Sequence, residues 1–133
     1  MSMWTHVAAV ARIDSFVEND DFSPVFGREC LAGDSREVWN EAQEHPERFL
    51  PMGSEGTLQM SVWINPQRNC LARYVVTIFG DLRDYQDGMG VIEWFKEKLK
   101  PLWVRQATIT VDIGTSKALN WTYDPFETDQ EET

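Results

Sequence analysis

Residues 57–65 alternate strictly between polar and apolar side chains, and this period of two constrains the fold more than any other feature. The apolar set is Leu58, Met60, Val62 and Ile64. Successive side chains of a β-strand point to opposite sides of a sheet, so the pattern predicts a strand with one buried face. Residues 65–69, which include Pro66, favour a hairpin turn. Residues 71–79 follow as a second strand that is apolar on both faces, which is typical of a central position in a sheet.

Three other segments have the pattern of strands. Residues 4–13 and 104–113 each place apolar side chains at alternate positions. Residues 118–123 are long enough for a short strand. Pro125 follows, and because proline has no backbone N–H to donate to a neighbouring strand, we expect this strand at the edge of the sheet. We therefore expect four strands and an optional fifth at the C-terminal edge.

Two segments have the features of helices. Residues 34–44 begin with Asp34, whose carboxylate can accept an unpaired backbone N–H of the first turn, and Pro46 ends the helix. Residues 87–100 carry apolar side chains at helical spacing, with three lysines near the end, where the helix dipole favours positive charge. The order of strand, helix, two-stranded hairpin, helix and strand predicts an α+β domain with the ferredoxin-like βαββαβ fold. This fold is an antiparallel sheet with two helices on one face, here with an optional extra C-terminal edge strand.

The negative charge of the chain is concentrated near its C-terminus. The 133 residues carry a net charge of −10, and residues 124–133 contain five acids and no base. We expect residues 1–123 to form a single domain and residues 124–133 to be a flexible acidic tail. Because an acidic surface repels phosphate groups, the composition argues against direct nucleic-acid binding.

Cysteine and histidine residues do not stand at metal-binding spacing. Cys30 and Cys70 are forty residues apart, and neither His6 nor His45 has a second ligand nearby in the sequence. There is also no phosphate-loop glycine pattern and no nucleophile motif, so we expect no metal and no cofactor, and a non-catalytic role is favoured. The N-terminus lacks signal-peptide features and no apolar run is long enough to span a membrane, which predicts a cytoplasmic protein without membrane contact.

Two helices can cover only one face of such a sheet, so the side chains of the opposite face must be covered by something else or form a binding surface. The side chains expected there are Ala8, Val10, Trp63, Arg73, Val75, Thr77, Phe79, Thr108 and Thr110. Residues 14–33 or the proline-rich connection 45–56 could fold over this face, or two copies of the chain could meet through it as a symmetric homodimer. Alternatively, the face is a ligand cleft in which Trp63 and Phe79 stack on the ligand and Arg73 binds its anionic group.

Residues 81–85 lie between a strand and a helix, where side chains often converge on ligands. Arg83 could bind a carboxylate or phosphate through two hydrogen bonds, and Tyr85 could stack on a ligand or donate a hydrogen bond. Alternatively, Asp84 or Asp87 caps the following helix and Arg83 pairs with a neighbouring acid. The candidate binding residues are therefore Trp63, Arg73, Thr77, Phe79, Arg83, Asp84 and Tyr85.

Three hypotheses about function follow. The first is a small non-catalytic binding protein that uses the second sheet face and residues 81–85 to self-associate as a homodimer or to hold a small anionic ligand. The second is an acidic inhibitor that blocks a basic groove on a partner protein by imitating nucleic acid. In size and charge, although in no motif, the chain resembles small acidic bacteriophage proteins that block host nucleases. The third is a small enzyme that uses Glu55, Asp81 or Asp84 as a general acid or base.

Overall fold

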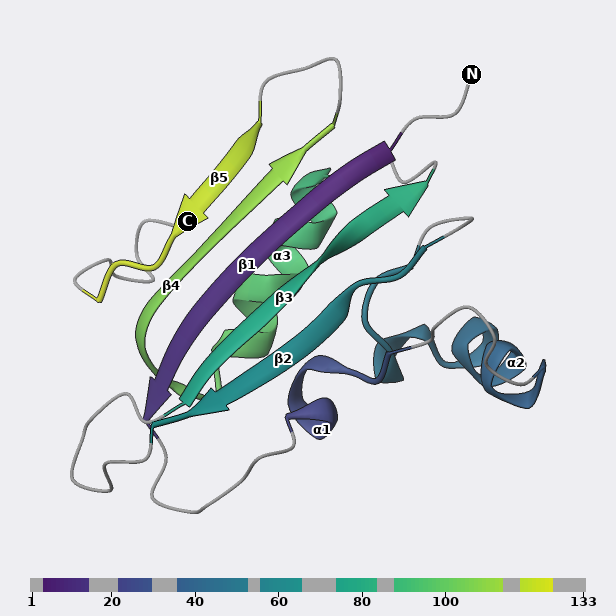
Figure 1. The fold of residues 1–133 in the computed structure, drawn as a ribbon, viewed down its shortest axis with the longest axis horizontal. Coiled ribbons are helices and arrows are strands. Elements are labelled where there is room, and N and C mark those ends of the chain that lie inside the picture. The colour runs from purple at the N-terminus through teal and green to yellow at the C-terminus, as the bar shows by residue number, and fades with distance from the viewer. Residues whose placement is uncertain are drawn as a thin grey trace.

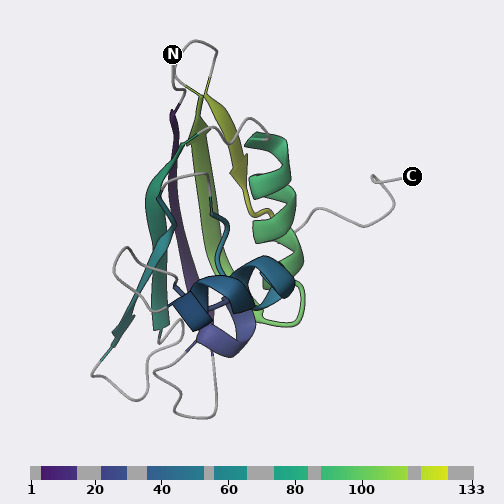
Figure 2. The same cartoon turned by 90° about the vertical axis from the view of Figure 1, so that its right-hand side faces the viewer.

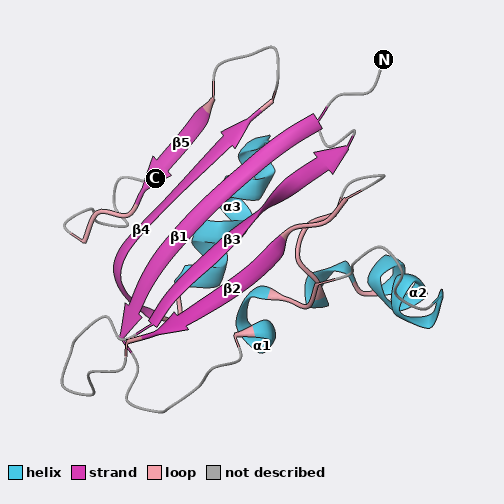
Figure 3. Cartoon of the chain, viewed as in Figure 1, coloured by secondary structure: helices cyan, strands magenta, loops and turns pink. Residues whose placement is uncertain are grey.

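The computed structural model describes residues 4–14, 22–29, 36–52, 56–65, 74–83, 88–113 and 118–125. Within these residues, five strands form one antiparallel sheet in the order β2-β3-β1-β4-β5 (Figure 1, Figure 3). The strands are β1 (Trp4–Asp14), β2 (Gln59–Ile64), β3 (Tyr74–Arg83), β4 (Trp103–Asp112) and β5 (Leu119–Thr122). A strand is therefore present in each of the five segments where the sequence pattern places one.

Three helices and one 3-10 turn accompany the sheet in the described part of the chain. They are α1 (Ser23–Phe26), α2 (Arg36–Glu44), the 3-10 turn η1 (Pro46–Arg48) and α3 (Gly88–Leu99). α3 connects β3 to β4 and lies along one face of the sheet (Figure 2). None of the described helices has both the length and the apolar character needed to cross a membrane.

The core lies between the sheet and α3. Alternate residues of β1, from Val7 to Ile13, are buried on this side, as the period of two predicts. The buried apolar side chains of α3 are Val91, Ile92, Phe95 and Leu99. β5 adds Trp121, whose ring centroid lies 6.2 Å from that of Phe95 in an edge-to-face arrangement. The edge strand therefore helps to close the core as well as extending the sheet.

The expected ferredoxin-like fold is wrong, because the helix that precedes the hairpin does not pack across the sheet. α2 lies beyond the β2 edge of the sheet and packs against η1 (Figure 1). Its Ala42 is buried against Phe49 in a small cluster that is separate from the main core. The sheet is thus covered by one long helix, α3, and not by two.

Aromatic residues in and directly before α1 occupy part of the inner face that a second helix was expected to cover. Phe22 meets Tyr74 of β3 edge-on, with 5.4 Å between the ring centroids, and Phe26 stacks on Phe95 at 6.4 Å. Phe22 and Phe26 belong to the main core, whereas Ala42 of α2 belongs to a separate small cluster.

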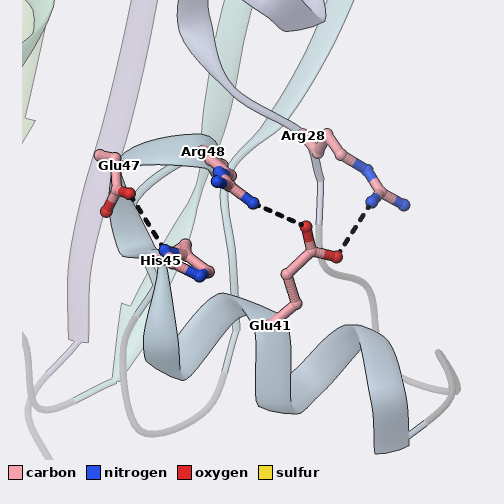
Figure 4. Close-up of polar contacts among 5 residues, drawn as sticks. All are labelled: Arg28, Glu41, His45, Glu47 and Arg48. Carbon is pink, nitrogen blue, oxygen red and sulfur yellow. Dashed lines mark ion pairs between the residues drawn. The ribbon is translucent and has the colours of Figure 1, made fainter.

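Ion pairs hold α2 against the neighbouring segments (Figure 4). Glu41 of α2 lies 3.6 Å from a guanidinium nitrogen of Arg28 and 3.6 Å from one of Arg48. His45 and Glu47 form a further pair with a nitrogen–oxygen distance of 3.4 Å. Because these side chains are partly exposed, the ion pairs orient α2 more than they stabilise it.

β3 continues through Gly80, where the sequence pattern ends the strand. The φ angle of Gly80 is +152°, and a Cβ atom at this position would lie 2.8 Å from the carbonyl oxygen of Thr57. Only glycine permits so close an approach of the two backbones. As a result, Asp81 and Arg83 are strand residues paired with β1 and not parts of a loop.

Candidate functional site

The sheet face opposite α3 is the candidate site, and it is termed the open face below (Figure 2). It consists of the even-numbered residues of β1, the odd-numbered residues of β2 and β3, and the even-numbered residues of β5. From β4 it includes the even-numbered residues from Gln106 onwards and, beyond a shift in register, Trp103 and Arg105. The side chains of a strand alternate between the two faces, so these residues share one side of the sheet.

Large apolar side chains are exposed mainly on the open face. Five are exposed in the described residues, and four of them belong to this face: Trp4 (38%), Trp63 (54%), Phe79 (44%) and Trp103 (63%). The fifth is Met89 at the start of α3. Single exposed apolar side chains are normal on protein surfaces, but four aromatic rings on one sheet face are typical of a contact surface.

Strand pairing arranges the open face in rows across the sheet. Ala8 of β1 lies directly beside Phe79 of β3. In the next row, Val10 lies between two threonines, Thr77 of β3 and Thr108 of β4. Because all of these residues except Phe79 are small or β-branched, another sheet can approach the middle of the open face closely.

Threonine hydroxyl groups of the open face are hydrogen-bonded within it. Thr77 Oγ1 donates to the carbonyl oxygen of Ser61 at 3.3 Å. Thr110 Oγ1 donates to Asn120 Oδ1 at 2.9 Å. A polar group is costly to bury when it lacks a partner, and these hydroxyls would keep their partners if the face were covered. Burial of these two hydroxyl groups would therefore leave neither without a partner.

Charge is balanced on the open face although the chain as a whole is acidic. The charged residues of the five strands on this face are Arg12, Arg83, Arg105, Asp14, Asp81 and Asp112. Their formal charges cancel, whereas the whole chain carries −10. One pair is joined directly, since Nε of Arg105 lies 2.6 Å from Oδ2 of Asp14. A surface without net charge can meet a copy of itself without general repulsion.

Four of the seven residues predicted to bind a ligand or partner lie on the open face, and they are Trp63, Thr77, Phe79 and Arg83. Phe79 pairs with Gln59, which stands four residues before Trp63 on β2. At the usual rise of a strand, the two rings are therefore separated by about 13 Å along the strand direction. This spacing is too wide for both rings to stack on one small ligand.

Arg83 lies at the end of the open face, and the remaining three predicted residues lie outside the described structure. Arg83 is the last residue of β3 and pairs with Trp4 at the start of β1. Arg73, Asp84 and Tyr85 lie outside the described residues. The structure thus brings Arg83 beside an exposed tryptophan, a neighbour that the sequence did not indicate.

The described part of residues 14–33 does not cover the open face. Phe22 and Phe26 belong to the core on the α3 side of the sheet, and Leu50 of the connection 45–56 packs with them. The aromatic side chains of the open face stay exposed. The expectation that these segments cover the open face is therefore wrong for the residues that the structure describes.

Sequence reasoning missed a contact between His6 and Asp81. The two residues pair directly across β1 and β3, and Nδ1 of His6 lies 2.6 Å from Oδ1 of Asp81. On its other side, His6 pairs with Asp112 of β4. The alternating pattern of each strand indicates that these side chains share a face, but only the register of the sheet places them in one row.

Most of the residues considered as a general acid or base, and both cysteines, lie outside the described structure. Glu55, Asp84, Cys30 and Cys70 all lie there. Asp81 is more than half exposed and is hydrogen-bonded to the imidazole of His6, as described above. Among the described residues there is no group of three His, Cys, Asp or Glu side chains that could hold a metal ion.

A cleft of about 520 Å³ lies on the α3 side of the sheet, between the α2–η1 segment and α3. No pattern in the sequence indicated this cleft. Its lining is mainly apolar and includes Trp94 and Phe49, together with Glu47 and Lys98 as charged groups. A hydrogen bond from its own backbone N–H lowers the pKa of Glu47, and the nearby His45 lowers it further. The cleft has the size of a small-molecule site, but its opposite charges provide no excess of positive charge for an anion.

The open face and the cleft are the features of the described structure to which a function can be related. They lie on opposite sides of the sheet, so occupation of one does not block the other. Comparison of the chain with protein-family models, with curated proteins and with solved structures found no match.

Proposed function

We propose that this chain is a non-catalytic binding protein that self-associates as a homodimer through the open face. One observation carries the proposal: four exposed aromatic side chains and a balanced set of charges share one face of a chain with a net charge of −10. Exposed aromatic residues are enriched where proteins contact one another. Charge balance makes a copy of the same surface an acceptable partner.

The size of the open face supports this proposal. Strands lie about 4.8 Å apart and rise about 3.3 Å per residue, so a sheet with these five strands covers roughly 650 Å². Each partner in a standard protein interface buries about 800 Å². A second copy that covers the whole open face would therefore bury nearly the area of a standard interface.

A second copy suits the open face better than the other partners considered. A small anionic ligand requires an excess of positive charge, and a basic protein requires an excess of negative charge. The six charged strand residues of the open face provide neither excess. An acidic inhibitor is a second proposal, and it draws on the net charge of −10 that the chain carries. Such binding would weaken strongly as salt is added.

The molecular mass of the chain in solution tests self-association. We expect sedimentation velocity over a wide range of concentrations to show a dimer. Phe79→Lys should weaken this dimer by more than about ten-fold, because it places a charge near the middle of the interface. Met89→Lys is the matched control, since Met89 is similarly exposed but lies on α3. A monomer at every concentration, or a dimer that responds equally to both substitutions, would refute the proposal.

A further inference from the structure

Two charged rows cross the open face at equal distances from the middle of β1, which is Ala9. The acidic row, three residues before Ala9, consists of Asp81, His6 and Asp112. The basic row, three residues after Ala9, consists of Val75, Arg12 and Gln106. The charges of the described strand residues on the open face therefore cancel, but the two ends of the face along β1 differ in sign near the central strands.

The packing of sheets restricts how two such faces can meet. Two identical sheets that meet face to face are related by a two-fold axis that lies in the plane between them. Sheets that pack in the aligned manner keep their strand directions within about 30° of each other, whereas the strands of orthogonal sheets cross at about 90°. A rotation about an in-plane axis turns the strand direction by twice the angle between axis and strand. In aligned packing, the axis therefore lies nearly along the strands or nearly across them.

An axis along β1 brings like charges together. This rotation keeps every residue at the same position along the strand direction. It exchanges the positions of β3 and β4, which flank β1. Asp81 of one copy would then face the partner's Asp112, and Arg12 would face the partner's Arg12. Like charges that lie directly opposite each other destabilise an interface, so the charges of the open face disfavour this arrangement.

An axis across the strands at the level of Ala9 brings opposite charges together. This rotation exchanges the two ends of the open face along β1, so that the acidic row of each copy faces the basic row of the other. We infer that the dimer uses this axis and that Arg12 of each copy lies between the partner's Asp81 and the partner's Asp112. This inference rests on the proposed function, because it requires the open face to be the interface.

The geometry of the side chains is compatible with this arrangement. Face-to-face sheets are separated by about 10 Å, and the long arginine side chain spans much of this distance. Its guanidinium group carries five N–H donors, enough to reach carboxylates on both sides. Near the axis, Ala8 faces the partner's Val10 and Phe79 faces the partner's Thr77, so the large ring meets a small side chain.

Single charge reversals distinguish the two axes. With the axis across the strands, Asp81→Arg places a second cation beside the partner's Arg12 and should weaken the dimer by about ten-fold or more. With the axis along β1, the same substitution would face the partner's Asp112 and strengthen the dimer. Arg12→Asp should weaken the dimer to a similar extent, whereas an axis along β1 predicts little change. Sedimentation equilibrium measures each dissociation constant.

A mixing experiment excludes misfolding as the cause of these losses. Arg12→Asp and the double variant Asp81→Arg/Asp112→Arg should each dimerise weakly when alone. An equimolar mixture should form a heterodimer with close to the affinity of the unmodified chain, because every contact then joins opposite charges. Glu93→Arg on α3 and Lys100→Asp directly after α3 are controls with the same changes in charge, and we expect both to leave the dimer unchanged.

The outcomes separate the inference from the proposed function. If the unmodified chain is a monomer at every concentration, both are wrong. If the chain is a dimer that Phe79→Lys disrupts, but Asp81→Arg strengthens it or Arg12→Asp leaves it unchanged, the open face is the interface and the inferred axis is wrong. Weakening by both charge reversals together with recovery in the mixture would establish the axis across the strands.

Discussion

Nδ1 of His6 lies 2.6 Å from Oδ1 of Asp81, across the pair of central strands β1 and β3 on the open face. Both side chains are more than half exposed, so water and salt screen their interaction. We expect a double-mutant cycle with His6→Gln and Asp81→Asn to give a coupling energy of about 0.2–1 kcal/mol. Urea unfolding at low protein concentration measures it. A coupling energy that does not fall on addition of salt would contradict this reading of the pair.

The packing of α3 on the sheet predicts a large effect of Phe95→Ala. Phe95 is 1% exposed, and its ring lies against those of Phe26 and Trp121. Removal of a buried phenylalanine ring leaves a cavity and should lower the free energy of unfolding by about 3–5 kcal/mol. Met89→Ala, on the exposed side of the same helix, should change it by less than about 0.5 kcal/mol. Similar small losses for both variants in guanidinium unfolding would show that α3 does not cover the core.

The conformation of Gly27 predicts that this position does not tolerate alanine. Its φ angle is +124°, and a Cβ atom would lie 2.5 Å from the carbonyl carbon of Phe49 and 2.8 Å from the nitrogen of Leu50. Backbone atoms cannot rotate away, so Gly27→Ala should cost about 1–3 kcal/mol of stability.

Gly88→Ala provides the comparison for Gly27. Its added methyl group would meet the ends of three side chains, those of Ile113 at 2.8 Å, Leu119 at 3.0 Å and Val111 at 3.2 Å. Ends of side chains can shift more readily than backbone atoms. Gly88→Ala should therefore cost less than Gly27→Ala in thermal unfolding, and the reverse order would contradict the backbone contact at Gly27.

The carboxyl group of Glu47 should titrate below its usual range. The main cause of the lowered pKa is a hydrogen bond from its own backbone N–H, and the charge and hydrogen bond of His45 also contribute. Because the pKa is lower in the folded state, ionised Glu47 stabilises the fold above the pKa of the unfolded chain. This stability is lost as the pH falls through the folded pKa.

A carboxyl NMR titration measures this shift, and His45→Gln separates its causes. We expect the substitution to raise the pKa of Glu47 only part of the way to its usual value, because the backbone hydrogen bond remains. Complete recovery of the usual pKa would assign the whole shift to His45. A Glu47 that titrates normally in the unmodified chain would contradict the geometry of η1.

Much of the local structure could be predicted because periodicity is a property of neighbouring residues. The alternation of residues 57–65 and 104–113 identified β2 and β4, and helical spacing identified α3. The same alternation placed Trp63 and Phe79 on one face of the sheet. The end of β3 was missed because glycine usually interrupts a strand, whereas Gly80 allows the neighbouring backbone to approach.

The amino-acid sequence by itself determined where strands and helices form and which side chains of each strand share a face, since both follow from the local spacing of apolar residues. Only the tertiary structure decided that Phe22 and Phe26, and not α2, complete the inner face. It also decided that His6 meets Asp81, because strand register depends on contacts between residues far apart in the chain. Competition for space in the core and pairing between strands are interactions among distant residues, and no local pattern records their outcome.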